Sequence, residues 1–296
     1  MPRGNGTLKA FVRDWAPPGL IRLVQSGLDY VRPAPWEYVE KGWRTDIPVQ
    51  GWNAPSITET QKRNWRAFAE SLKGTGPLVV NHEDPYINSG GLRDHNTIIS
   101  CAYVLALAAR QKECLSVLDW GGGMGHYYLL SEAVLPEVQI EYYCQDLPLL
   151  CQAGREVLPR AHFFERPDGC FSQQYDLILA SSSVWYEENW RPLVDRLISV
   201  ANPYLYVTRM IFVEQAASYV AMQRPWAVGY RTEYLCWILN RGEFVDYVSA
   251  QGMDVVREFL ISRGPHIHDA PEQGDYRGFL FRKKAAATIN GRTRSS

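Results

Sequence analysis

Residues 117–126 have the composition of a ligand-binding turn. They read Val-Leu-Asp-Trp-Gly-Gly-Gly-Met-Gly-His, with an acid ahead of regularly spaced glycines. Glycine lets a backbone turn sharply and approach a ligand closely, and the helix that follows presents free N–H groups. The dinucleotide fingerprint would need Gly or Ala where this chain has His126. We expect a ligand to contact Asp119, Gly121, Gly123, Gly125 and His126, with Asp119 orienting the loop N–H groups or reaching a ligand ammonium.

Two further acids stand at the ends of the next two expected strands. Asp146 precedes Leu-Pro, and a carboxylate at a strand tip can accept hydrogen bonds from both hydroxyls of a ribose. Asp before Leu-Pro is also typical of a helix N-cap, and both roles can hold together. Glu165 is placed to receive an adenine amino group or to lie on the surface as an ordinary carboxylate. Leu147 and Ser181 complete the expected contacts.

Strand and helix patterns alternate regularly from residue 94 onward. Apolar periodicity of 2 or 3.6 residues, interrupted by turn residues, separates the two kinds of element. It predicts strands at 115–120, 139–145, 162–165, 176–180, 204–207, 255–261 and 278–282, and helices at 94–110, 125–134, 148–157, 190–200 and 244–251. Strands that alternate with helices form a parallel sheet with helices on both faces. Asp94 or Asn96 is expected to cap the first of these helices.

The last two predicted strands are joined by residues 262–275, a His-, Pro- and Gly-rich loop without a crossover helix. They should therefore pair antiparallel. The expected fold class is α/β, Rossmann-like, with a mostly parallel sheet and a C-terminal antiparallel hairpin. We place the main domain at residues 95–283 and a flexible polar tail at 284–296.

The N-terminal part of the chain is rich in tryptophan and proline. Half of the ten tryptophans lie there: Trp15, Trp36, Trp43, Trp52 and Trp65. We expect residues 1–94 to form an aromatic-rich helical cap, with short helices at 20–28 and 58–72. Trp36, Trp43 and Trp52 could seal the site against water and line its pocket, or pack the cap onto the sheet.

Composition excludes several classes of protein. The chain has 31 basic and 32 acidic side chains among 296 residues, which argues against binding nucleic acid or another polyanion through charge neutralisation. The N-terminus lacks the apolar core of a signal peptide, and no apolar run is long enough to span a membrane. The six cysteines form no Cys-x-x-Cys pair, so we expect free thiols, no metal site and a cytoplasmic location.

The segment 119–125 resembles the first motif of the class I S-adenosylmethionine-dependent methyltransferases, and the resemblance covers about residues 95–283. Residues 36–43, 179–186 and 234–240 are similar to a poorly characterised bacterial family of methyltransferases. Its members are often encoded near glycosyltransferases in polysaccharide or natural-product gene clusters. The Asp146-Leu-Pro motif is similar to that of plant caffeate-type O-methyltransferases, whose Asp holds the ribose. The resemblance implies S-adenosylmethionine as the cofactor.

The catalytic base is less well defined by the sequence. The caffeate-type enzymes have a histidine after the fourth strand, where this chain has Tyr186-Glu-Glu. The Asn-Pro-Pro-Tyr motif of nucleic-acid amino-methyltransferases is also absent, since Ser181 begins a Ser-Ser-Ser run there. A hydroxyl acceptor usually needs a base, whereas an amine need only arrive neutral. The candidates are Tyr186, the cluster at 82–86 together with His95 near the start of the first helix, and His266 and His268 in the loop between the last two strands.

Residues 209–240 lie where an insertion commonly builds the acceptor pocket in this fold. They contain aromatic residues with Arg and Gln between them, which suits a sugar or another small polar acceptor, although an aromatic helix pair packed on the core would have the same composition. We expect O-methylation of a saccharide or small polar metabolite. The alternatives are an N- or C-methyltransferase of natural-product biosynthesis and a catalytically silent cofactor-binding subunit. The oligomeric state stays open.

Overall fold

The computed structural model describes residues 33–44, 46, 49–76, 78 and 91–284. The chain divides into two compact units, Met1–Pro35 and Trp36–Ser296, and the elements described below belong to the second. The helix predicted at 20–28 lies outside the described residues, as do residues 285–296 of the predicted tail. The helix predicted at 58–72 is α3 (Pro55–Ser71).

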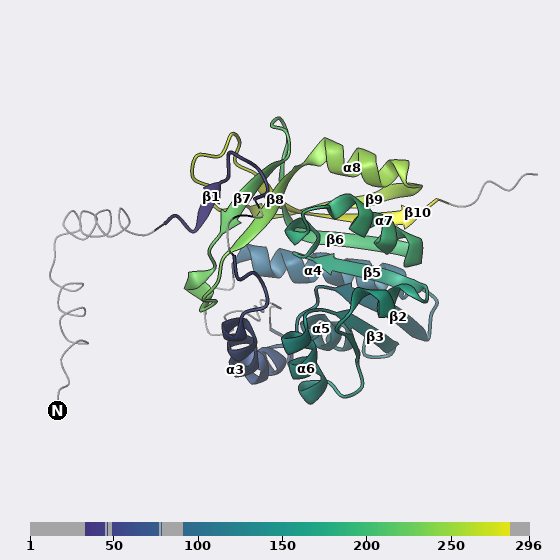
Figure 1. Cartoon of the computed structure of the whole chain (residues 1–296). Coiled ribbons are helices and arrows are strands. Elements are labelled where there is room, and N and C mark those ends of the chain that lie inside the picture. The colour runs from purple at the N-terminus through teal and green to yellow at the C-terminus, as the bar shows by residue number, and fades with distance from the viewer. Residues whose placement is uncertain (1–32, 45, 47–48, 77, 79–90, 285–296) are drawn as a thin grey trace, which may run out of the picture. The chain divides into compact units, whose positions relative to one another are not determined.

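A twisted sheet forms the centre of the second unit (Figure 1). Its parallel strands follow the spatial order β4 (His162–Phe164), β3 (Gln139–Gln145), β2 (Cys114–Trp120), β5 (Tyr175–Ser181) and β6 (Ala201–Val213). Next to β6 lies β10 (Asp275–Lys283), which pairs antiparallel with both β6 and β9 (Met253–Arg263). The predicted Rossmann-like sheet with a C-terminal antiparallel hairpin is thus confirmed.

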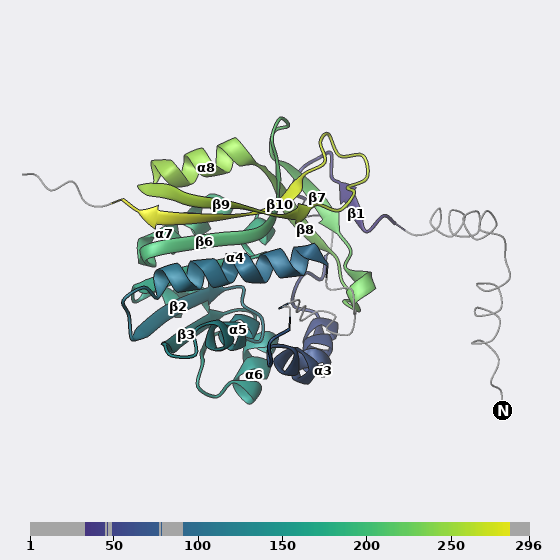
Figure 2. The same cartoon turned by 180° about the vertical axis from the view of Figure 1, so that it is seen from behind.

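Helices cover both faces of this sheet. They are α4 (Leu92–Ala108), α5 (His126–Val134), α6 (Pro148–Val157), α7 (Trp190–Val200) and α8 (Arg241–Ala250), with short 3-10 turns η1 (Pro167–Phe171), η2 (Val184–Tyr186) and η3 (Trp226–Val228). Helix α7 lies across the face seen in Figure 1, and α4 across the opposite face seen in Figure 2. Because neighbouring residues of a strand point to opposite faces of the sheet, each strand contributes side chains to two separate hydrophobic cores.

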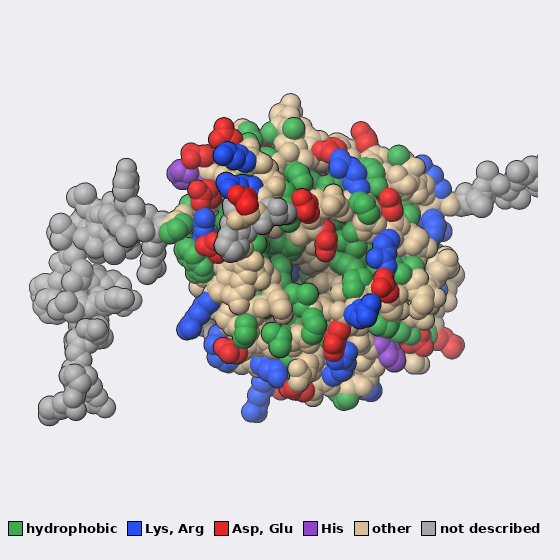
Figure 3. All heavy atoms as spheres, viewed as in Figure 1, with side chains coloured by type: hydrophobic (Ala, Val, Ile, Leu, Met, Phe, Trp, Pro, Cys, Tyr) green, Lys and Arg blue, Asp and Glu red, His purple; other side chains and the backbone are tan. Residues whose placement is uncertain are grey.

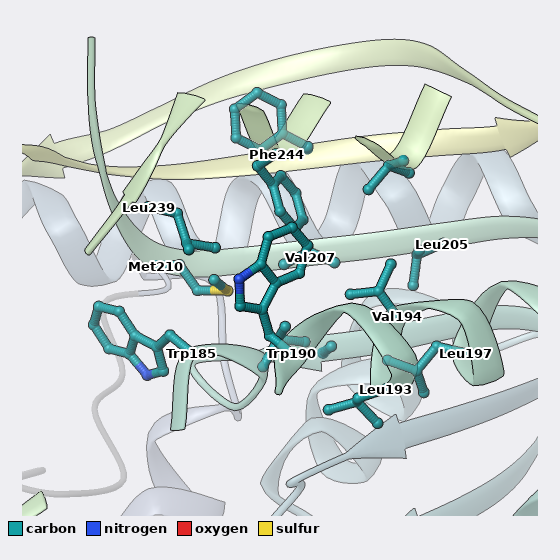
Figure 4. Close-up of a cluster of buried hydrophobic side chains, with 14 of the residues drawn as sticks. Trp185, Trp190, Leu193, Val194, Leu197, Leu205, Val207, Met210, Leu239 and Phe244 are labelled. Atoms are coloured by element: carbon teal, nitrogen blue, oxygen red, sulfur yellow. The ribbon is translucent and has the colours of Figure 1, made fainter. Parts of the chain in front are cut away.

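The two cores can be followed along β2. Leu115 and Val117 pack toward α4 and α5, whereas Leu118 and Trp120 pack in the cluster around α7. Figure 4 shows the cluster around α7, in which side chains of α7 and η2 lie against those of β6, β8 (Tyr234–Asn240) and α8. Its labelled members are Trp185, Trp190, Leu193, Val194, Leu197, Leu205, Val207, Met210, Leu239 and Phe244. This alternation also decides on which side of the sheet each polar residue of a strand lies.

Residues 209–240 form a hairpin rather than a helix pair. After β6 the chain turns into β7 (Tyr219–Gln223) and β8 (Tyr234–Asn240), which pair antiparallel. Strand β8 continues the main sheet beside the end of β6, and β1 (Trp36–Tyr38) adds to the free edge of β7. The aromatic residues of this segment therefore lie on strands and turns rather than on a helix pair, and β1 ties the N-terminal segment into the same sheet.

Two predicted element boundaries differ from those in the structure. Helix α4 begins at Leu92 with Gly91 as its N-cap, so neither Asp94 nor Asn96 caps it. Instead Asn96 donates from Nδ2 to the carbonyl oxygen of Ile261, a contact distant in sequence. Strand β6 is far longer than the predicted 204–207, because pairing with β10 carries it past the polar pair Thr208 and Arg209.

Candidate ligand-binding site

A pocket of about 440 Å³ opens at the carboxyl ends of the parallel strands. From β2 the sheet continues through β3 and β4 in one direction. In the other direction it continues through β5 and β6, so the strand order reverses between β2 and β5. The crevice between the two halves is where ligands bind in open α/β sheets. In the view of Figure 3, apolar side chains border a hollow near the centre of the surface. The pocket lining includes Gly121, Gly123, His126, Asp146, Leu147, Glu165, Ser181, Tyr186, Arg209, Gln223, Tyr230 and Tyr234.

The glycine loop adopts the conformation that its composition predicts. Gly121 has φ of +71°, and its N–H donates to the carbonyl oxygen of Gln145 at 2.8 Å. A Cβ on Gly121 would lie 2.5 Å from the Cβ of Ser183, so a side chain is excluded by both conformation and space. Gly125, with φ of +90°, caps α5 and does not line the pocket, since its Cβ position faces Leu158 beneath the loop.

Asp146 braces the loop from the neighbouring strand. Its Oδ2 accepts a hydrogen bond from the N–H of Gly123 and its Oδ1 from the N–H of Leu147, both at 2.7 Å. The N-cap of α6 is Leu147, so Asp146 is not a helix cap. Burial raises the pKa of Asp146 to about 6, against the lowering effect of these two hydrogen bonds. The site thus holds a carboxylate that faces the pocket and fixes the glycine loop.

Asp119 lies beneath the pocket rather than in its lining. It is fully buried and accepts a hydrogen bond from the hydroxyl of Tyr142, and its other oxygen has no hydrogen-bond partner among the described residues. Strand alternation turns it toward α4 and α5, so it neither reaches the ligand side nor bonds the loop N–H groups as expected. Its carboxylate instead fills the space below Gly122, whose Cβ would lie 2.5 Å from Oδ2.

The remaining expected cofactor contacts all reach the pocket. Leu147, Glu165 and Ser181 line it. Glu165 is partly exposed and accepts a hydrogen bond from Arg155 Nη1 at 2.5 Å, while the hydroxyls of Ser181 and Tyr127 lie 2.8 Å apart.

His126 also lines the pocket, but it is not the exposed helix residue that its position allowed. Its buried ring lies 4.9 Å from that of Trp65 and 5.0 Å from that of Phe68. Both rings come from α3, so the N-terminal segment packs directly on the first turn after the glycine loop. This contact fixes α3 at the rim of the site.

Tyr186 is the one predicted catalytic residue that the structure brings to the pocket. Its hydroxyl donates to Gln223 Oε1 at 2.7 Å. Burial raises the pKa of Tyr186 well above its usual value of 10. A phenol in this state keeps its proton near neutral pH, so the geometry suits Tyr186 to positioning Gln223 or a ligand rather than to accepting a proton.

The three predicted histidines lie outside the pocket lining. His266 and His268 are exposed in the loop between β9 and β10, and Nδ1 of His268 lies 2.9 Å from an Asp269 oxygen. That loop is held at β1, since Tyr38 N–H donates to the carbonyl oxygen of His268. The loop therefore lies against the edge strand β1, and neither histidine lines the pocket. His95 lies in the first turn of α4, and the predicted base cluster at 82–86 falls outside the described residues.

An aromatic chamber forms one end of the pocket. The Trp52 ring stacks on Tyr234 with centroids 4.5 Å apart, and it meets Tyr186 and Tyr230 edge-on at 5.2 and 6.1 Å. Trp36 and Trp43 do not reach the pocket, since they pack on Trp185 and Trp237. Of the three tryptophans expected to seal the site, Trp52 alone lines it.

Replacing Trp52 by alanine should destabilise the protein by about 3 kcal/mol, the lower end of the range for large aromatic residues, because Trp52 is only partly buried. Urea unfolding measures the loss. Trp226→Ala is the control, since Trp226 is 40% exposed, and its loss should stay below about 1 kcal/mol. Equal losses in the two variants would contradict the packing role of Trp52.

Several residues of the pocket lining were not predicted as site residues, among them Gln61, Arg209 and Gln223. Gln61 on α3 donates from Nε2 to the hydroxyl of Tyr230 at 3.3 Å, and Arg209 and Gln223 reach the pocket from β6 and β7. Arg209 and Gln223 lay in the segment flagged for the acceptor, but Gln61 carried no signal of its own. Among the described residues, no three His, Cys, Asp or Glu side chains gather as a metal site requires, and no helix is long and apolar enough to cross a bilayer.

Comparison with known proteins gave structural neighbours alone. No family model and no curated protein matches the chain. A Burkholderia thailandensis 1,6-didemethyltoxoflavin-N1-methyltransferase with bound S-adenosylhomocysteine is 13% identical over 85% of this chain and 100% of its own, with a TM-score of 0.46. The O-methyltransferase of a Brevibacillus brevis trans-AT PKS multienzyme, also with S-adenosylhomocysteine, is 13% identical over 62% of this chain and 72% of its own, at 0.46.

A pericyclic reaction enzyme is 13% identical to this chain, with a TM-score of 0.42. The match covers 61% of this chain and 47% of that enzyme, so the chain spans about half of its length.

Proposed function

We propose that this protein is an S-adenosylmethionine-dependent methyltransferase acting on a small organic acceptor. The observation that carries the proposal is the pairing of Asp146 with the glycine loop at the switch point of the sheet. One carboxylate there holds the N–H of Gly123 and faces a pocket large enough for a nucleoside and a small acceptor.

Different residues of the pocket would bind the different parts of the cofactor and the acceptor. Asp146 would accept hydrogen bonds from the ribose hydroxyls, with Leu147 beside the adenine ring and Glu165 near its amino group. The loop from Gly121 to Gly123 would lie along the methionine portion. When bound, S-adenosylmethionine supplies a methyl group on a sulfonium, which an acceptor displaces in line.

The protein's part in such a displacement is mainly alignment and exclusion of water. The aromatic chamber of Trp52, Tyr186, Tyr230 and Tyr234 would hold the acceptor with its reacting atom toward the glycine loop. Polar groups of Gln223 and Arg209 stand among these rings. Flat rings with amide and guanidinium groups between them suit a saccharide or another small polar metabolite, so O-methylation is our first candidate reaction.

N-methylation is the second candidate, favoured by one specific observation. Burial keeps the hydroxyl of Tyr186 protonated, and His95, His266 and His268 do not line the pocket. A neutral amine reacts without a protein base, whereas a sugar hydroxyl needs one. Transfer of a radiolabelled methyl group to matched amine and alcohol acceptors would separate the two.

Calorimetric titration with S-adenosylmethionine and S-adenosylhomocysteine tests the proposal. Both should bind one to one, and S-adenosylhomocysteine at a hundred times its Kd should stabilise the fold by about 2.7 kcal/mol. NAD is the control ligand, since the glycine spacing departs from the dinucleotide fingerprint. Binding of NAD without binding of either sulfur nucleoside would overturn the proposal. Cofactor binding without transfer to any acceptor would point to the silent subunit.

A further inference from the structure

Strand β6 contains a β-bulge where it passes the pocket. On β10, Arg277 stands opposite Met210 and Phe279 opposite Val207, so Gly278 faces both Thr208 and Arg209. The extra residue is Arg209, whose φ is +58° in the left-handed region. Two residues opposing one, with one of them left-handed, is the geometry of a bulge. A non-glycine residue seldom adopts such a backbone, because its Cβ crowds the neighbouring carbonyl oxygen.

The surrounding backbone is built to keep this bulge. The neighbouring Ser182 also has a positive φ, of +55°, and its N–H donates to the carbonyl oxygen of Thr208 at 2.8 Å. Opposite the bulge a side chain is excluded, because a Cβ on Gly278 would lie 2.7 Å from Oγ1 of Thr208. Bulges beside functional sites re-aim a side chain, and here the re-aimed residue is Arg209, which lines the pocket.

Arg209 stands on the far side of the pocket from the two cofactor acids. Asp146 and Glu165 follow β3 and β4, whereas Arg209 is on β6, with β2 and β5 between them. From β6 the chain runs directly into the hairpin that supplies Gln223 and Tyr234 to the aromatic chamber. Arg209 therefore belongs to the acceptor end.

We propose that Arg209 binds a carboxylate of the acceptor, so that the acceptor is a small organic acid with a planar or apolar body. This rests on the proposed function and names its substrate class. The guanidinium offers a planar fork that matches a carboxylate, and such charge-assisted pairs are stronger than neutral hydrogen bonds. The rings of Trp52, Tyr186 and Tyr234 would pack the body of the same molecule.

Matched acids and amides test this assignment. The protein is first saturated with S-adenosylhomocysteine and then titrated with 4-hydroxybenzoate and 4-hydroxybenzamide, and with indole-3-carboxylate and indole-3-carboxamide. In each pair the acid should bind at least about tenfold more tightly than the amide. Arg209→Gln should remove this preference, Arg209→Lys should keep part of it, and Arg257→Gln, at an exposed arginine on β9, should leave it unchanged.

The outcomes separate the two proposals. Failure of S-adenosylhomocysteine to bind the unmodified protein would reject the proposed function. If it binds but acids and amides bind equally or not at all, Arg209 does not select an acidic acceptor. The assignment is also overturned if Arg209→Gln weakens S-adenosylhomocysteine and leaves 5′-methylthioadenosine unaffected, because the partner would then be the carboxylate of the cofactor. Circular dichroism and urea unfolding would show that each variant is folded.

Discussion

Replacing Asp146 by alanine should weaken S-adenosylhomocysteine binding by at least about 100-fold while the chain stays folded. Under the proposed function the variant would lose two charge-assisted hydrogen bonds to the ribose, each worth about 1.5–3 kcal/mol. It also leaves the N–H groups of Gly123 and Leu147 without their acceptor. Asp146→Asn should also bind S-adenosylhomocysteine more weakly. The Asn side chain has an NH2 group in place of one carboxylate oxygen, and this donor would face the N–H of either Gly123 or Leu147. Calorimetry measures both variants.

The control for this prediction is Asp246→Ala, an exposed aspartate on α8. Its cofactor affinity should equal that of the unmodified protein. An affinity of Asp146→Ala within threefold of the unmodified protein would remove Asp146 from the site. The pH dependence of S-adenosylhomocysteine binding gives a second check. Because the pKa of Asp146 is raised to about 6, S-adenosylhomocysteine should bind more weakly as the pH falls below about 6 and the carboxylate gains a proton.

The free energy of unfolding should fall as the pH rises from about 4 to about 7, chiefly because of Asp119. Burial raises the pKa of Asp119 from 3.8 to about 7, against the lowering effect of the hydrogen bond from Tyr142. The folded state therefore holds a proton that the unfolded state has released. This penalty is absent below pH 4 and complete above pH 7, and at 1.36 kcal/mol per pKa unit it reaches up to about 4 kcal/mol.

Asp119→Asn should flatten most of this pH dependence in urea unfolding of the ligand-free protein. The residual slope should have the same sign, since the pKa of Asp146 is raised as well. Asp246→Asn should keep the full slope, because that carboxylate is exposed. An unchanged slope in Asp119→Asn would mean that Asp119 is ionised in the folded protein at all these pH values.

The sequence predicted the strand and helix order well from residue 94 onward. The strands and helices at 139–145, 148–157 and 190–200 have the predicted bounds. Local patterns suffice there because each element repeats one period without interruption. The hairpin of β7 and β8 was missed, because its aromatic residues are buried by partners distant in the chain, such as β1 against β7. Pairing between distant strands leaves no local periodicity.

The site residues likewise fall into those with a local sequence signature and those placed by contacts between distant parts of the chain. Sequence by itself determined the glycine loop and Asp146, because a positive φ and an acid at a strand tip have local signatures. Only the tertiary structure decided that Asp119 lies beneath the pocket, that the loop of His266 and His268 lies against β1, and that Arg209 lines the pocket. Strand direction, loop path and a bulge opposite Gly278 set those positions. Each depends on which strands pair, and the pairing of distant strands is settled when the whole sheet packs.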